Sequence, residues 1–222
     1  MRVILLGAPG SGKGTQGDLI EKAYAFPKVS SGDILRRAVQ DRTPWGQEAE
    51  KEMKQGRLVS DSVVLELIRE RIRMPDCRKG YVLDGYPRNL AQARSLTEID
   101  DKRHETTIEI EVSPDVLIKR LGARRICSRC ERIYNLEVLK PARDGLCDDC
   151  SEPLVLRPDD APGVIGKRLK VYEEQTLPLR SYYKKKGAYH RLDGERSIPD
   201  IFKDIRRILD LELAKAGEIG AQ

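Results

Sequence analysis

The chain has 222 residues, of which 35% are charged and 39% hydrophobic, and its formal net charge at pH 7 is +5. This length allows one sizeable core with one or two inserted lobes. No apolar run approaches the roughly 18 residues of a membrane span, and no export signal precedes the first expected strand, so we expect a cytoplasmic protein. The small positive excess among charges of both signs favours anionic ligands over a dedicated nucleic-acid surface.

The first expected elements are a buried strand at residues 3–6, a glycine-rich loop and a helix from Lys13 to Ala23. The loop, residues 7–15, reads Gly-Ala-Pro-Gly-Ser-Gly-Lys-Gly-Thr. Its glycines let successive backbone N–H groups converge beside the positive end of the helix, which is an arrangement that binds phosphate. Lys13 would add a mobile charge and Thr15 a hydroxyl on the metal side. A glycine-rich turn with an incidental lysine is the less favoured alternative.

The next segment predicts short helices and turns. Residues 28–30 predict a strand that leads into a helix capped by Ser31 or Asp33. Residues 44–55 predict another helix, and a further helix is capped by Ser60 or Asp61. Taken alone, this segment shows only caps, a turn and solvated arginines.

A second candidate site follows the buried strand that begins at Tyr81 and ends in Asp84. In an open parallel sheet, ligands lie outside the carboxyl ends of the strands, so Asp84 and Arg88 are expected in the same crevice as Lys13. A carboxylate there suits magnesium, mostly through water, and an arginine suits bidentate binding of phosphate. Gln92 lies one helical turn farther and could present its amide to a base. The alternative is a structural Asp84–Arg88 salt bridge.

Four cysteines form two Cys-x-x-Cys pairs: Cys127 with Cys130, and Cys147 with Cys150. Two such pairs complete a closed four-sulfur site without an open position for water, so we expect structural zinc that contributes folding energy to a small polar lobe. A redox dithiol is less favoured, and iron in place of zinc is left open. Cys77 is interpreted as a core thiol.

The remaining elements complete an alternating pattern. Residues 106–112 predict a strand, and a helix from Ser113 is expected to run through Arg120, Arg124 and Arg125. Residues 164–186 predict one long helix, residues 189–192 a fifth strand, and residues 198–213 a closing helix. The pattern predicts an α/β fold, a doubly wound parallel sheet of about five strands with two inserted lobes.

Five motifs, in order along essentially the whole chain, resemble those of the adenylate kinase family in its long bacterial form with a metal-bearing lid. They are the loop at 7–15, Ser-Gly-Asp-Ile-Leu-Arg at 31–36, Asp-Gly-Tyr-Pro-Arg at 84–88, the four cysteines, and Arg-Pro-Asp-Asp at 157–160. The resemblance implies a P-loop core at residues 1–29, 60–121 and 161–222, an AMP-binding lobe at 30–59 and a zinc-binding lid at 122–160. It implies reversible phosphoryl transfer from Mg-ATP to AMP, giving two ADP, by a monomer whose lid closes to exclude water.

The resemblance also implies roles for individual residues. The charge-neutralising set would be Lys13, Arg88, Arg124, Arg157 and Arg168. ATP would contact Gly10, Ser11, Gly12, Lys13, Gly14, Thr15, Arg120, Arg124, Ile133, Tyr134 and Arg196. AMP would contact Ser31, Arg36, Arg57, Leu58, Val59, Gly85, Tyr86, Pro87, Arg88, Gln92, Arg157 and Arg168. Asp84 would hold magnesium through water, and Cys127, Cys130, Cys147 and Cys150 would hold zinc.

Four positions depart from common patterns. Gly14 intervenes between the loop lysine and Thr15, and Ser31 stands where the family more often has threonine. Gly163 and Gly166 each cost about 1 kcal/mol relative to alanine in a helix, which suggests a looser lid hinge.

Two other functions remain open at this stage. One is a kinase for GMP, UMP or CMP, or one that uses GTP as donor. The other is a nucleic-acid-binding module in which a zinc ribbon grips the nucleic acid and the P-loop acts as a switch, although the ribbon lacks interleaved aromatic residues. Neither His104 nor His190 lies in a motif, so no nucleophile with a histidine base is proposed.

Overall fold

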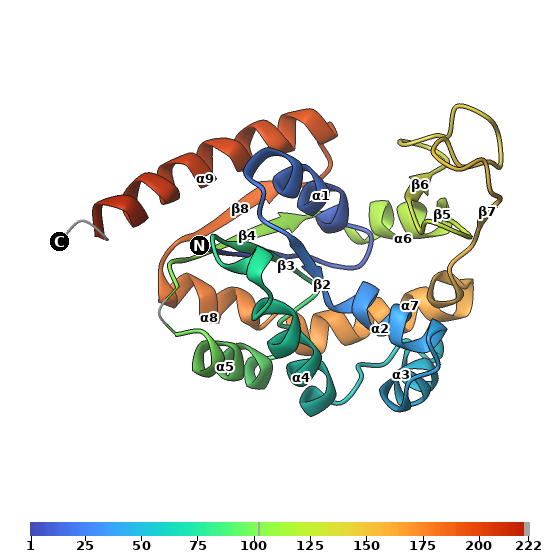
Figure 1. The fold of residues 1–222 in the computed structure, drawn as a ribbon. Coiled ribbons are helices and arrows are strands. Elements are labelled where there is room, and N and C mark those ends of the chain that lie inside the picture. Colours follow the sequence, from blue (N-terminus) through green and yellow to red (C-terminus); the bar gives the residue numbers. More distant parts are fainter. Residues whose placement is uncertain (102, 220–222) are drawn as a thin grey trace.

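The computed structural model describes residues 1–101 and 103–219, which form a five-stranded parallel sheet with helices on both faces (Figure 1). The strands are β1 (Arg2–Leu6), β2 (Lys28–Ser30), β3 (Tyr81–Asp84), β4 (Glu105–Glu111) and β8 (Tyr189–Asp193), in the order β2-β3-β1-β4-β8. All neighbouring strands pair in parallel, with Val3 opposite Val82 and Thr106 in the register. The α/β fold expected from the sequence is confirmed.

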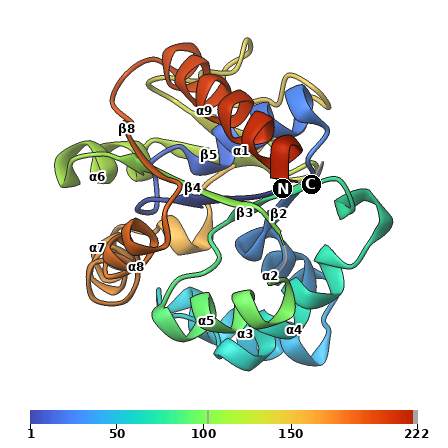
Figure 2. The same ribbon diagram turned by 90° about the vertical axis from the view of Figure 1, so that its left-hand side faces the viewer.

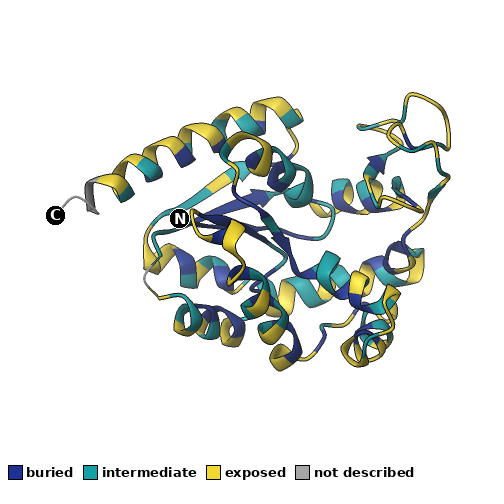
Figure 3. Cartoon of the chain, viewed as in Figure 1, coloured by how far each residue is buried: buried dark blue, intermediate teal, exposed yellow. Residues whose placement is uncertain are grey.

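Two apolar layers enclose the sheet, because successive side chains of a strand point to opposite faces. Val3 and Leu5 pack with α1 (Lys13–Tyr24) and α9 (Ile198–Ile219), whereas Ile4 and Leu6 pack with the layer on the other face. Figure 2 shows α1 and α9 on one side of the sheet. The other side is covered by α2 (Ser31–Gln40), α4 (Asp61–Ile72), α5 (Leu90–Ile99) and α8 (Leu179–Lys186). Figure 3 shows the buried strands between helices whose outer faces are exposed.

Two smaller parts extend from this core. One is formed by α3 (Pro44–Lys54), which packs against α2, and here Thr43 caps α3 and Pro44 occupies its first turn. The other is a three-stranded antiparallel sheet with the order β6-β5-β7. Its strands are β5 (Arg124–Cys127), β6 (Ile133–Asn135) and β7 (Leu154–Val155). It follows α6 (Pro114–Gly122), and its return passes through a 3₁₀ turn at Pro158–Asp160.

Two helix predictions were wrong in detail. The helix after Ser113 ends at Gly122, and Arg124 and Arg125 lie on β5, because the chain there pairs with β6. The expected helix at 164–186 is divided into α7 (Pro162–Val171), a π-helical turn at Tyr172–Thr176, and α8. Leu177 donates its N–H to the carbonyl of Tyr172 at 2.9 Å, and Pro178 has no N–H with which to continue the α-helical pattern.

The closing helix α9 begins at Ile198 as expected and extends to Ile219, beyond the expected residue 213. Its apolar stripe packs against α1 and the sheet through Ile201, Ile205 and Leu209. None of the helices in the described ranges is long and apolar enough to cross a membrane.

Candidate active site

The glycine loop joins β1 to α1 at the carboxyl edge of the sheet. Gly7 has a φ of +144°, and a Cβ atom there would lie 2.5 Å from the carbonyl oxygen of Ile110, so only glycine fits. Gly10 and Gly12 also have positive φ angles, of +85° and +97°. Within the described part of the chain, no side chain caps the first turn of α1 and no acidic residue lies in it. Its N–H groups are therefore available to an anion.

Lys13 folds back over this loop. Its ammonium group donates hydrogen bonds to the carbonyl oxygens of Gly7 at 2.7 Å and Ala8 at 2.8 Å. Desolvation lowers the pKa of Lys13 to about 8, although the carboxylate of Asp84 opposes the shift. The lysine is thus a desolvated charge that a phosphate group would stabilise.

Arg88 occupies the region beside the ends of β2 and β3. It donates from Nε to the carbonyl oxygen of Gly85 at 2.7 Å and from a terminal nitrogen to Ser31 Oγ at 3.4 Å. Ser31 Oγ in turn donates to the same carbonyl at 2.6 Å. Desolvation lowers the pKa of Arg88 to about 10, and the nearby guanidinium of Arg168 adds to the shift. This arginine and hydroxyl form a compact group of donors of the kind that suits a phosphate.

Asp160, whose side chain is completely buried, organises the arginines of the small sheet and α7. It accepts a bidentate pair of bonds from Arg124 at 2.6 and 2.5 Å, and a bond from Arg168 at 2.5 Å. Arg168 also forms an ion pair with Asp159 at 3.1 Å. Two guanidinium groups from different elements are thereby held in fixed orientations.

Arg157 and Arg36 complete the basic lining. Arg157 is 5% exposed and forms an ion pair with Asp33 at 3.9 Å. Desolvation lowers the pKa of Arg157 to about 10, with Arg36 and Arg124 contributing. Arg36 pairs with Asp33 as well. Because one carboxylate serves both arginines, this wall of the site favours further negative charge.

These elements enclose a cavity of about 650 Å³. All the residues expected to contact ATP line it, as do Asp84 and all those expected to contact AMP except Tyr86. Tyr86 is fully buried, and its hydroxyl donates to the carbonyl oxygen of Gln92 at 3.3 Å. Arg57 and Arg196 lie at the wall, paired with Glu52 at 2.6 Å and Asp204 at 2.7 Å.

Four carboxylates of this site could not be assigned from the sequence. No role was predicted for Asp159 or Asp160, although they directly follow Arg157-Pro158, and Asp33 and Asp61 were predicted only as helix caps. Asp160 pairs with an arginine 36 residues away, and Asp61 bonds to Gln92, 31 residues away. Residue type alone could have marked these acids, but only the fold supplies their partners.

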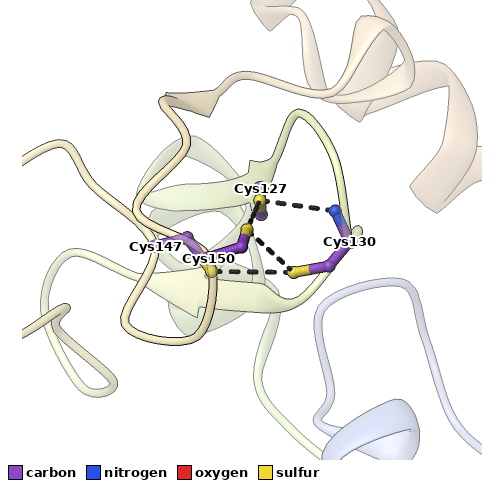
Figure 4. A group of neighbouring side chains, drawn as sticks. All are labelled: Cys127, Cys130, Cys147 and Cys150. Atoms are coloured by element: carbon purple, nitrogen blue, oxygen red, sulfur yellow. Dashed lines mark hydrogen bonds between the residues drawn. The ribbon is translucent and has the colours of Figure 1, made fainter.

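The four cysteines meet beside β5 (Figure 4). Their sulfur atoms all lie within 4.8 Å of one another, with Cys127 to Cys150 at 3.3 Å and Cys130 to Cys147 at 3.6 Å. A disulfide would need about 2.0 Å, whereas a tetrahedron of Zn–S bonds of about 2.3 Å has edges of about 3.8 Å. Soft thiolate donors in this arrangement fit zinc.

The chain matches the family model described as adenylate kinase over residues 5–188. It is 45% identical over 212 residues to an adenylate kinase of Moorella thermoacetica, covering 94% of this chain and 98% of the relative. It is 46% identical over 214 residues to an adenylate kinase of Nitrosococcus oceani, covering 95% and 99%. A third relative, an adenylate kinase of Syntrophobacter fumaroxidans, is 47% identical over 212 residues, covering 94% and 100%.

Proposed function

The chain belongs to the adenylate kinase family, and we propose that it transfers the terminal phosphoryl group of Mg-ATP reversibly to AMP by charge neutralisation and lid closure. The supporting observation is the convergence of the glycine loop and basic side chains from the core, the α2 region and the small sheet on one cavity. Phosphoryl transfer depends on positioning and on stabilisation of phosphate charge more than on a covalent nucleophile.

Each part of the cavity has a task in this proposal. The loop N–H groups and Lys13 bind the ATP phosphates, with Ser11 and Thr15 beside them. Ser31, Arg36 and Arg88 bind the phosphate of AMP. The two phosphates then face each other across the cavity, which is the arrangement that in-line transfer needs.

The arginines held by Asp160 act on the group in transfer. Arg124 lies on β5 in the lid, Arg157 directly precedes the turn at Pro158–Asp160, and Arg168 lies on α7, which follows the lid. Negative charge spreads over the phosphoryl oxygens in the transition state, and preoriented guanidinium groups stabilise it without reorganisation. Removing one such donor typically costs about 10²–10³ in kcat.

Asp84 suits the magnesium site. Its Oδ2 lies 3.4 Å from the position of a Cβ at Gly14, so the carboxylate is next to the phosphate loop. Carboxylate oxygens are hard donors of the kind that Mg²⁺ binds, usually with several waters retained. When bound, the ion would neutralise the phosphates of ATP.

The lid and the AMP-binding lobe would exclude water when nucleotides are bound. Glu131 of the lid accepts a hydrogen bond from Gln40 of α2 at 2.6 Å, and Ile133 Cδ1 lies 3.8 Å from the position of a Cβ at Gly14. Contacts of this kind bring the lid over the loop. Exclusion of water suppresses hydrolysis of ATP and strengthens electrostatic interactions in the site.

The decisive experiment measures diphosphate formation from Mg-ATP with AMP, GMP, UMP, CMP or no acceptor. We expect rapid turnover with AMP and almost no ATP hydrolysis without acceptor. Preference for another monophosphate would correct the substrate. If folded, metal-loaded protein phosphorylates no monophosphate, the proposed activity is refuted and the nucleic-acid-binding alternative becomes the better interpretation.

A further inference from the structure

The side-chain amide of Gln92 is held at both ends. Its oxygen accepts a hydrogen bond from the backbone N–H of Arg88 at 2.7 Å, and its nitrogen donates to Asp61 Oδ1 at 2.6 Å. Gln92 is 2% exposed and lines the cavity. A half-turn flip would place the amide oxygen against a carboxylate and the NH₂ group against an N–H donor. Both hydrogen bonds would be lost, so the amide has one stable orientation.

Asp61 is itself fixed in place. It is the first residue of α4, and the side-chain nitrogen of Asn89 donates to its two oxygens at 3.0 and 3.1 Å. Asn89 caps α5, because its side-chain oxygen accepts the backbone N–H of Gln92 at 2.8 Å. The carboxylate, the cap and the amide therefore form one connected network between two helix starts.

A fixed amide can distinguish purines by the group at C6. Its oxygen keeps one free lone pair and its nitrogen one free hydrogen, so it offers one acceptor and one donor in a set order. Adenine carries an amino group at C6 beside a ring-nitrogen acceptor, whereas hypoxanthine and guanine carry an oxygen at C6. An amide free to flip would accept either pattern, but a fixed amide matches one.

We propose that Asp61 is a positioning residue that fixes the orientation of the Gln92 amide and so makes the acceptor site select a 6-amino purine over a 6-oxo purine. This inference rests on the proposed function. Asp61 bonds to Gln92, and its effect reaches the substrate through that amide.

The test compares AMP with inosine monophosphate, which differs from AMP in having an oxygen at C6 and a hydrogen on N1. Asp61→Asn replaces a pure acceptor with a group that can accept or donate, so the residue at position 61 no longer opposes the flipped amide of Gln92 and only the backbone N–H of Arg88 still does. We expect the ratio of kcat/KM for AMP to that for inosine monophosphate to fall by about tenfold, mostly through KM. Asp61→Ser, which also can donate or accept and suits a helix start, should give the same direction.

Glu66→Gln provides the matched control. Glu66 is an exposed carboxylate on the same helix, paired with Arg69 at 3.0 Å, and its removal should leave the ratio unchanged. Thermal denaturation of each variant shows whether the protein is folded. A purely structural role of Asp61 would lower both values of kcat/KM together.

The outcomes separate this inference from the proposed function. If the unaltered chain prefers AMP and both Asp61 variants keep the full ratio, Asp61 does not set the selection and the inference is overturned. Equal use of both monophosphates by the unaltered chain overturns it as well. If the unaltered chain phosphorylates neither, the proposed function is refuted and the inference with it.

Discussion

Loss of the metal should unfold the lid while the core stays folded. The buried cluster of the lid contains Cys127, Tyr134 and Cys147, with Cys150 and Leu154 packed against it. Apart from the thiols, this leaves two apolar side chains, whose burial contributes about 1.5–3 kcal/mol each. Apparent zinc-binding free energies of about 10–16 kcal/mol in structural sites exceed that contribution by a factor of about three. Bound zinc would therefore be the largest stabilising interaction in this lobe.

Cys130→Ser isolates this effect, because Cys130 is exposed and its replacement removes a metal ligand without opening a core cavity. We expect purified Cys130→Ser protein to bind zinc weakly and to be cleaved rapidly by protease between residues 124 and 155. Kinase activity should fall by at least about tenfold, because the lid arginines lose their support. Cleavage sites can be mapped by mass spectrometry, and zinc can be measured by release to a metallochromic dye.

Cys77→Ala is the control, because Cys77 lies outside the cysteine cluster. This substitution should leave the zinc content and the cleavage of the lid unchanged. A metal-free lid that resists protease as well as the loaded protein would refute the reasoning, because the thiols and two apolar side chains would then suffice.

Three further predictions concern charge. Arg88→Met should lower kcat/KM by at least about 10³. It should also raise the melting temperature of the nucleotide-free protein, because burial lowers the pKa of Arg88 to about 10 and so disfavours its charge. A fall in melting temperature would contradict this reasoning. The pKa of Lys13 is lowered to about 8 and a bound phosphate favours its charged form, so ATP affinity should fall above pH 8 by up to tenfold per pH unit. Calorimetry in two buffers measures the proton uptake that accompanies binding. Lys13→Arg should abolish this pH dependence. Burial also lowers the pKa of His190, so its contribution to the free energy of unfolding should be complete above about pH 6.5 and should decrease as the pH falls below that value. Denaturant titrations of His190→Gln should show a smaller decrease than those of the unaltered chain. An equal decrease would exclude His190 as the cause.

The looser lid hinge expected at Gly163 and Gly166 remains a prediction. Gly163 and Gly166 lie in α7, and apart from the chain neighbours and backbone of the helix itself, no described atom lies within 4 Å of the position of a Cβ atom at either glycine. Packing therefore does not require glycine there, which fits the hypothesis of a looser hinge. Hydrogen exchange as slow in this turn as in the central helices would contradict it.

Local sequence was sufficient wherever the chemistry is short in range. The loop around Lys13, the strand that ends in Asp84 and the two Cys-x-x-Cys pairs each depend on residues a few positions apart. Backbone N–H groups of a glycine loop and thiolates at fixed spacing have few geometrical solutions. For this reason the sheet, the glycine loop between β1 and α1 and the cysteine cluster could all be predicted before the structure.

Tertiary structure decided which charges meet. The bidentate bond from Arg124 to Asp160, the hold of Asp61 on Gln92 and the ion pair between Arg157 and Asp33 join residues far apart in the sequence. A sequence marks such side chains as solvated, because exposed acids and bases are the ordinary case and burial is a property of the packed chain. The division of the expected long helix likewise depended on how Pro178 could be accommodated between α7 and α8. Sequence thus determined the fold, the glycine loop and the cysteine pairs, whereas packing determined which carboxylate orients each arginine and the amide of Gln92.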